Sequence, residues 1–182
     1  EQLVAATKRK SLALFTSYRG LRVAREALAR LRGSQRASWG SLLVQGDAPR
    51  SELVRRFREE VKSVLLGTES FAEGVDVPGE SLSVVVVDRL PFAPPDDPVY
   101  DAVDAMSPRG AFFTWSLPRA VTALRQRAGR LIRRASDRGV VVVLDDRVVT
   151  KGYGASFTRA LAPMPISRDL SVVRSFLFPE EA

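Results

Sequence analysis

The residues best suited to chemistry lie in one short arginine-rich stretch, Leu124 to Arg133. Within it, Gln126, Gly129, Arg130 and Arg133 have the spacing Q-x-x-G-R-x-x-R. Arg130 and Arg133 are three positions apart, so on a helix they would lie on one face. Two guanidinium groups side by side suit a phosphoryl group that develops negative charge, and Gly129 would let a ligand or another backbone approach closely. A solvated basic helix face would show the same charges, so a second motif is needed to decide.

That second motif is the stretch Gly67 to Gly79, which contains glycines, small hydroxyls and carboxylates. It directly follows the apolar residues Val64 to Leu66, which are typical of a short strand. In an open α/β sheet, a loop that follows a strand commonly forms the edge of a ligand site. The loop is therefore a candidate for binding, although many ordinary loops have a similar composition.

The elements that must position these stretches alternate between strand and helix. We expect strands at residues 12–16, 41–44, 63–66, 83–87 and 139–144, and helices at residues 20–31, at 51–60 and from Leu117-Pro118 onward. Strands that are apolar throughout, such as the valine run from Val84 to Val87, are typical of a parallel sheet covered on both faces. The sequence therefore predicts an α/β fold.

Two parts of the chain depart from this alternation. Residues 91–117 are rich in proline and aspartate, contain several aromatic residues and are too long for a tight connection. We expect them to form an irregular insertion that leaves the sheet and is partly packed by its aromatics. Near the end of the chain, we expect one more helix over residues 153–161 and then an extended tail that contains prolines.

Together, the stretches at residues 67–79 and 124–133 resemble motifs V and VI of superfamily 2 helicases, in the DinG-type, XPD-like branch. Residues 11–18 resemble motif IV of that family, and residues 82–92 resemble the strand and Leu-Pro-Phe turn that follow motif V. The resemblance runs from about Ser11 to about Leu161 in the family's order. It implies a RecA-like parallel sheet with helices on both faces, and it implies that residues 1–182 are a single C-terminal motor domain from a larger protein.

The resemblance also implies roles for individual residues. Arg130 and Arg133 match the two arginines of motif VI, which reach the γ-phosphate as arginine fingers and act mainly in the transition state. Gln126 matches the glutamine that contacts the nucleotide or the attacking water. The implied nucleotide-binding residues come from both motifs and are Glu73, Gly74, Asp76 and Gly129. For Asp76, a role in capping loop amides is an equally good interpretation.

The implied DNA contacts follow the first strand and the strand before motif V. Hydroxyl, amide and guanidinium groups there can donate to phosphates without reading bases, and the candidates are Ser17, Arg19, Gly67, Thr68 and Ser70. For each of them, the alternative is an ordinary turn residue. One departure from the family is Ala72, where an aromatic residue is usual. Arg125, Arg127 and Arg134 match no motif position, and we expect them to be solvated.

Composition excludes several classes of chemistry. The chain has no cysteine and no histidine, so it contains no thiol nucleophile, no Ser-His-Asp triad and no cysteine or histidine ligand for a metal. Its net charge of +7 favours nucleic acid or nucleotide as a partner. Neither a long apolar span nor a signal-peptide pattern is present, so we expect no membrane association and a cytoplasmic location.

The sequence contains no G-x-x-x-x-G-K-[ST] phosphate loop and no acidic magnesium box. The resemblance accounts for this, because such helicases bind ATP with Mg²⁺ mainly through a first domain, which in many members also carries an iron–sulfur cluster. The implied partners are that N-terminal RecA-like domain and single-stranded DNA, with 5′-to-3′ translocation. By itself, this chain is expected to be inactive.

A different class of function also fits the composition. A stand-alone, non-enzymatic nucleic-acid-binding or regulatory α/β module would need no missing domain, since basic charge and loop hydroxyls suffice for it. It would leave the spacing of Gln126, Gly129 and the two arginines unexplained.

Overall fold

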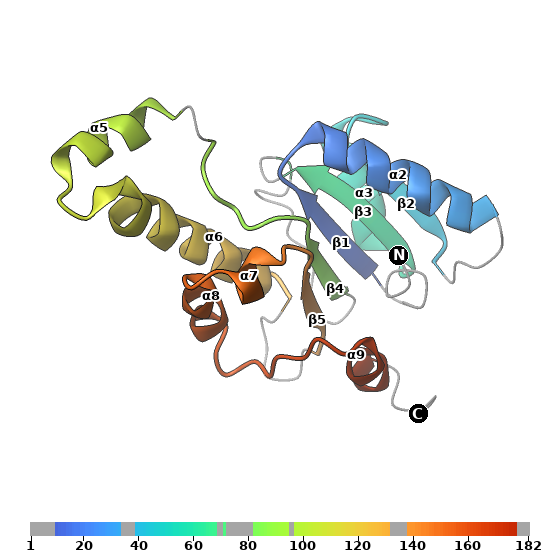
Figure 1. Ribbon diagram of the computed structural model, residues 1–182. Coiled ribbons are helices and arrows are strands. Elements are labelled where there is room, and N and C mark those ends of the chain that lie inside the picture. Colours follow the sequence, from blue (N-terminus) through green and yellow to red (C-terminus); the bar gives the residue numbers. More distant parts are fainter. Residues whose placement is uncertain are drawn as a thin grey trace. The chain divides into compact units, whose positions relative to one another are not determined.

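Among the residues that the structure describes, five parallel strands form one sheet in the order β2-β3-β1-β4-β5 (Figure 1). The strands are β1 (Lys10–Phe15), β2 (Ser41–Val44), β3 (Ser63–Thr68), β4 (Leu82–Val87) and β5 (Val140–Val143). This computed structural model describes residues 10–33, 39–68, 71, 82–94, 97–131 and 138–177. The predicted α/β fold with a parallel sheet is confirmed.

The chain divides into two units. The sheet unit contains residues 1–89, 129–144 and 167–182, and the helical unit contains residues 90–128 and 145–166. The prediction of a single domain with an insertion at 91–117 stays a prediction, since the helical unit includes a second, later segment of the chain.

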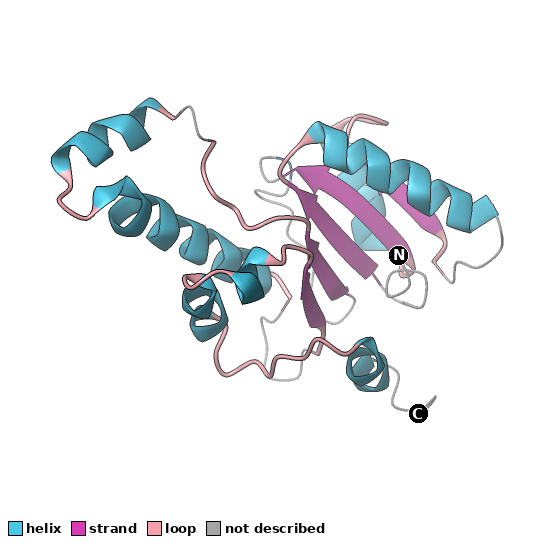
Figure 2. Cartoon of the chain, in the orientation of Figure 1, coloured by secondary structure: helices cyan, strands magenta, loops and turns pink. Residues whose placement is uncertain are grey.

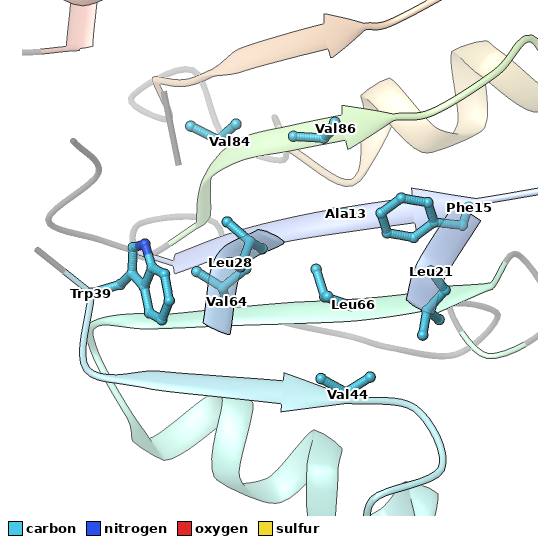
Figure 3. Close-up of a cluster of buried hydrophobic side chains, with 10 residues drawn as sticks. All are labelled: Ala13, Phe15, Leu21, Leu28, Trp39, Val44, Val64, Leu66, Val84 and Val86. Atoms are coloured by element: carbon cyan, nitrogen blue, oxygen red, sulfur yellow. The ribbon is translucent and has the colours of Figure 1, made fainter. Parts of the chain in front are cut away.

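In the sheet unit, helices lie on both faces of the sheet, with α2 (Tyr18–Gly33) in front of the strands and α3 (Arg50–Glu59) behind them (Figure 1). Successive strand residues point to opposite faces, and alternate residues of the central strands therefore meet α2. Leu21 and Leu28 of α2 pack in one buried cluster with strand residues that include Phe15 and Leu66 (Figure 3). On α3, the buried residues are Leu53 and Phe57.

The cluster under α2 extends from one end of the strands to the other. Trp39, which precedes β2, is buried at the amino end of the strands, whereas Phe15 and Leu21 lie at the carboxyl end (Figure 3). Trp39 is therefore a core residue, and the core anchors α2 along its length.

The end of the chain contains a helix that the sequence analysis missed. Helix α9 (Leu170–Leu177) begins after Asp169, whose carboxylate accepts a hydrogen bond from the backbone amide of Ser171 at 2.8 Å. Its last residue, Leu177, packs against the cluster under α2. The expectation of an extended tail is wrong for these residues, and the capping aspartate was the signal for the helix.

The helical unit replaces the irregular insertion that was expected. It contains α5 (Pro98–Met106), the π-helical turn η2 (Phe112–Ser116), α6 (Leu117–Gly129), α7 (Arg147–Thr150) and α8 (Gly154–Ala160) (Figure 2). Asp97 caps α5 by accepting from the backbone amide of Val99 at 2.9 Å, and Pro98 is pre-organised for the first turn. Much of segment 91–117 is therefore helical, because its proline and aspartate start a helix.

Aromatic side chains pack the helical unit, as expected from the sequence. Phe92 lies 5.7 Å from Phe112, 5.7 Å from Tyr153 and 5.8 Å from Phe157 between ring centroids. These contacts join the segment after β4 to η2 and α8. Within the described ranges, no helix is both long and apolar enough to cross a membrane.

Candidate functional site

The carboxyl edge of the sheet brings together residues from three separate segments. Phe15 at the end of β1 pairs with Thr68 at the end of β3, and Val44 at the end of β2 pairs with Leu66 of β3. The residues that follow β1 and β2, namely Ser17 and Gln45, therefore lie near Thr68 at the same edge. In parallel sheets, this edge is where ligands bind.

Ser17 forms the start of helix α2. Its Oγ accepts a hydrogen bond from the backbone amide of Gly20 at 3.2 Å, and its carbonyl oxygen accepts from the amide of Leu21 at 3.1 Å. The hydroxyl proton of Ser17 is not used in this cap, so the exposed side chain can still donate to an outside acceptor. Arg19 is exposed in the first turn of the same helix.

Thr68 is bonded to a residue that the sequence analysis did not single out. Its backbone amide donates to Gln45 Oε1 at 2.7 Å, and its hydroxyl lies 2.9 Å from the same oxygen. The two donors expected to meet DNA phosphates therefore bind another side chain of the chain. A role for Thr68 in DNA binding stays a prediction.

Gly67 has a packing reason to be glycine. A Cβ atom at Gly67 would lie 2.7 Å from Cδ1 of the Phe71 ring, a distance at which the ring would have to move. Phe71 is buried, and its carbonyl oxygen accepts from Nε of Arg50 at 3.2 Å. Phe71 therefore belongs to the core, and Gly67 makes room for it.

The end of α6 differs from the geometry expected for the arginine pair. Helix α6 ends at Gly129, and Arg130 lies in the turn that follows it. The helical spacing that would place Arg130 and Arg133 on one face is therefore not present at Arg130, and Arg133 lies outside the described residues. The side chain of Gln126 is exposed, and a Cβ atom at Gly129 would meet nothing within 4 Å.

The expectation that Arg127 is solvated is wrong, because only 4% of this residue is exposed. The buried residues of α6 recur at three and four positions, and Arg127 follows Leu124 by three in that series. The guanidinium group is enclosed together with the stem, since Nε and Nη1 of Arg127 are both buried. Arg125, by contrast, is exposed as expected.

Several predicted site residues cannot be placed. Residues of the motif V loop and of the segment after α6 lie outside the described residues, and they include Ser70, Ala72, Glu73, Gly74, Asp76, Arg133 and Arg134. The roles inferred for them stay predictions. Among the described residues, no group of three acidic, histidine or cysteine side chains could hold a metal ion.

The helical unit contains a buried carboxylate whose importance the sequence did not reveal. Asp145 accepts from the backbone amide of Leu90 at 2.8 Å and forms a two-point ion pair with Arg147, whose Nη2 lies 2.6 Å from Asp145 Oδ2. Hydrogen bonding to the Arg147 guanidinium lowers the pKa of Asp145 to about 2. Because its oxygens also accept from the backbone amides of Leu90 and Arg147, Asp145 fastens two segments of the chain to each other.

Comparison with known proteins identifies the family to which this chain belongs. The family described as "Helicase C-terminal domain" matches residues 1–164. The chain is 39% identical to ATP-dependent DNA helicase YoaA of Haemophilus influenzae over 96% of its own length, and 41% identical to ATP-dependent helicase DinG of Mycobacterium tuberculosis over 97%. It is also 40% identical to 3'-5' exonuclease DinG of Bacillus subtilis over 91%.

The chain is much shorter than these relatives. It spans 27% of the YoaA protein, 26% of the mycobacterial DinG protein and 18% of the Bacillus protein. Among solved structures, the Escherichia coli DEAD-box protein SrmB, bound to regulator of ribonuclease activity A, is similar with a TM-score of 0.56. That likeness covers 94% of this chain and 81% of the SrmB chain at 14% sequence identity, so it bears on the fold alone.

Proposed function

Because the chain belongs to the helicase C-terminal domain family and is a helicase motor domain, we propose that it acts as the second motor domain of a DinG-type ATP-dependent DNA helicase. The observation that carries this proposal is the family match over residues 1–164, a range that contains the stretches 67–79 and 124–133. The parallel sheet supports it, since one stretch begins at the end of strand β3 and the other begins within helix α6 and continues past its end.

In this proposal, ATP with Mg²⁺ binds mainly to a first domain outside this chain. Hydrolysis of ATP supplies the free energy for translocation. Arg130 and Arg133 would donate to the γ-phosphate and stabilise the charge of the transition state, and Gln126 would orient the attacking water.

The nucleotide side of the site would be completed by the loop residues Glu73, Gly74 and Asp76 and by Gly129. The exposed position of Gly129, with open space where a Cβ would lie, supports close approach by a group outside this chain. On the DNA side, Ser17 and Arg19 are exposed at the start of α2, where hydroxyl and guanidinium groups can contact phosphates without reading bases.

The first experiment tests whether this chain supplies only part of an ATP site. We expect this chain alone to show only background ATP hydrolysis, with or without single-stranded DNA, because it has no phosphate loop. The same chain joined to the domain that carries the phosphate loop should show hydrolysis stimulated by DNA. Stimulated turnover that copurifies with the isolated chain would contradict the proposal.

A second experiment tests the proposed DNA-binding surface at the start of α2, which we call the DNA track. The isolated chain should bind single-stranded DNA weakly and without sequence preference, as measured by fluorescence anisotropy. The logarithm of the association constant should fall by about 0.7 per neutralised phosphate for each tenfold rise in salt. With the longer protein, strand displacement from substrates with a 5′ or a 3′ overhang tests the proposed 5′-to-3′ direction, which requires activity on the 5′ overhang alone.

A further inference from the structure

An exposed aromatic ring lies at the carboxyl edge of the sheet and has no role in the site described so far. Tyr18 is the first residue of α2 and is 60% exposed. Its ring is therefore neither part of the core nor the cap of the helix, which Ser17 provides. A single exposed aromatic residue is common on protein surfaces, but Tyr18 is also held in place by a hydrogen bond to Gln45.

Gln45 holds the Tyr18 hydroxyl. The backbone amide of Thr68 can only donate, so the Gln45 atom 2.7 Å from it must be the carbonyl oxygen, Oε1. That assignment directs Gln45 Nε2 toward Tyr18, where it donates to the hydroxyl oxygen at 2.9 Å. One side chain thus joins the end of β2, the end of β3 and the start of α2.

These bonds restrain Tyr18 without covering it. With its hydroxyl tied to Gln45, the ring loses part of its rotational freedom before any ligand arrives, which lowers the cost of binding on its exposed surface. The hydroxyl proton is also left available, since Tyr18 accepts the bond from Gln45. An exposed, restrained aromatic ring beside a phosphate-binding edge matches the stacking platforms of proteins that bind single strands.

We propose that Tyr18 stacks on a base of the single-stranded DNA and that Gln45 is the positioning residue that holds it. The proposal rests on the proposed function, since it assigns a further contact to the same DNA track. Charge favours this occupant, because α2 carries five arginines and one glutamate. Arg19 and Arg22 of that helix are exposed near Tyr18, where they can attract the phosphate backbone.

The experiment compares two labelled oligonucleotides by fluorescence anisotropy with the purified chain. One is oligothymidine, and the other is an abasic strand of equal length, which keeps the sugars and phosphates but has no bases. Tyr18→Ala should weaken oligothymidine binding by about 5-fold to 150-fold and leave abasic binding unchanged. Phe113→Ala removes another exposed aromatic ring, 61% exposed in the helical unit, and should alter neither.

The same pair of strands tests Gln45. Gln45→Ala should lower the ratio of oligothymidine to abasic affinity by about 2-fold to 10-fold, the range for one lost hydrogen bond. A merely structural role would weaken both strands equally and leave the ratio unchanged. Tyr18→Phe keeps the ring but cannot accept a hydrogen bond from Gln45. The double variant Tyr18→Phe with Gln45→Ala should therefore lower the ratio of oligothymidine to abasic affinity no further than Gln45→Ala alone does.

A direct contact is tested by photocrosslinking. An oligonucleotide containing 5-iodouracil should crosslink to Tyr18, as located by mass spectrometry, and Tyr18→Ala should abolish that product. If Tyr18→Ala weakens binding of both oligonucleotides equally, or of neither, the stacking proposal is wrong. The proposed DNA-binding edge of the sheet would still stand. A chain that binds neither strand would remove the DNA track and the stacking platform together.

Discussion

The carboxyl edge of the sheet and the end of α6 both contain predicted site residues, but they differ in what those residues contact. At the sheet edge, Ser17 caps α2, Thr68 binds Gln45, and Gly67 makes room for Phe71. At the end of α6, Gln126 is exposed and Gly129 faces open space. The first region is built from groups that also hold the fold, whereas Gln126 and Gly129 in the second region are exposed.

This difference has a consequence for mutagenesis. Residues that serve only a ligand can be changed without loss of stability, so their effects should appear in turnover alone. Residues that serve both the fold and a ligand should change stability and binding together. The comparison therefore predicts which substitutions separate the two measurements and which do not.

The largest expected effect is at Arg130. In a protein that contains both motor domains, Arg130→Ala should lower kcat by about 10³ or more, because a transition-state contact is lost, while the melting temperature stays unchanged. Arg130→Lys should be almost as damaging, since an ammonium group lacks the planar fork. Arg125→Ala, at an exposed position of α6 outside the motif, is the control and should keep wild-type turnover. A large fall in melting temperature with modest loss of kcat would make Arg130 a structural residue.

The two glycines give the sharpest test of the comparison. Gly67→Ala places a methyl group 2.7 Å from the Phe71 ring, and overpacking of this kind costs about 1–3 kcal/mol. The melting temperature of the chain should therefore fall by about 2–10 °C. Gly129→Ala meets nothing within 4 Å and should leave the melting temperature unchanged or raise it slightly, since alanine is favoured over glycine in a helix, but it should impair ATP turnover of the longer protein. If the two variants change melting temperature and ATP turnover to the same extent, the sheet edge and the end of α6 do not differ in the way described.

The sequence predicted the sheet and the position of its carboxyl edge, because apolar strands and the residues after them are local patterns. It did not predict the contacts of Thr68, since Gln45 is 23 positions away and no pattern links an isolated glutamine to its partner. Arg127 was assigned to solvent because of its charge, although its spacing from Leu124 placed it among the buried residues of α6. In both cases, tertiary packing decided the outcome and residue type alone was insufficient.

The helices of segment 91–117 were missed for another reason. Proline and aspartate were interpreted as signs of irregular structure, but Asp97 and Pro98 stand at the start of α5, where both residues favour a helix. The same applies to Asp169 before α9. Capping residues are informative only when their position relative to the helix is considered, and the proline-rich composition concealed that position.

Asp145 is a charged group whose contacts stabilise the folded chain. Its carboxylate is 5% exposed and is held by Arg147 and by the amide of Leu90. Since its pKa falls from 3.8 to about 2 on folding, the ionised form contributes stability above pH 4, on the order of 2 kcal/mol. That contribution should be lost as pH falls from about 4 to about 2.

Asp145→Asn tests this assignment. The variant should be less stable than the parent near neutral pH, because Arg147 loses the charge of its buried partner. Its free energy of unfolding should also lack the fall between about pH 4 and pH 2 that Asp145 causes in the parent chain. Urea titrations at several pH values measure both effects. Asp146→Asn, at an exposed neighbour, should keep the stability and the pH dependence of the parent, and a parallel loss in both variants would contradict the role given to Asp145.

The smallest expected effect is at Ser17, where the fold and the proposed DNA contact share one hydroxyl. Ser17→Ala removes the cap of α2 and should cost about 1 kcal/mol of stability, together with a loss of DNA affinity. Ser17→Asp separates the two roles, because a carboxylate caps a helix as well as a hydroxyl does but repels phosphate. The aspartate variant should therefore melt like the parent chain and bind single-stranded DNA more weakly. If it binds DNA as well as the parent does, Ser17 serves the fold alone, and the sheet edge near α2 contacts DNA through other groups such as Arg19.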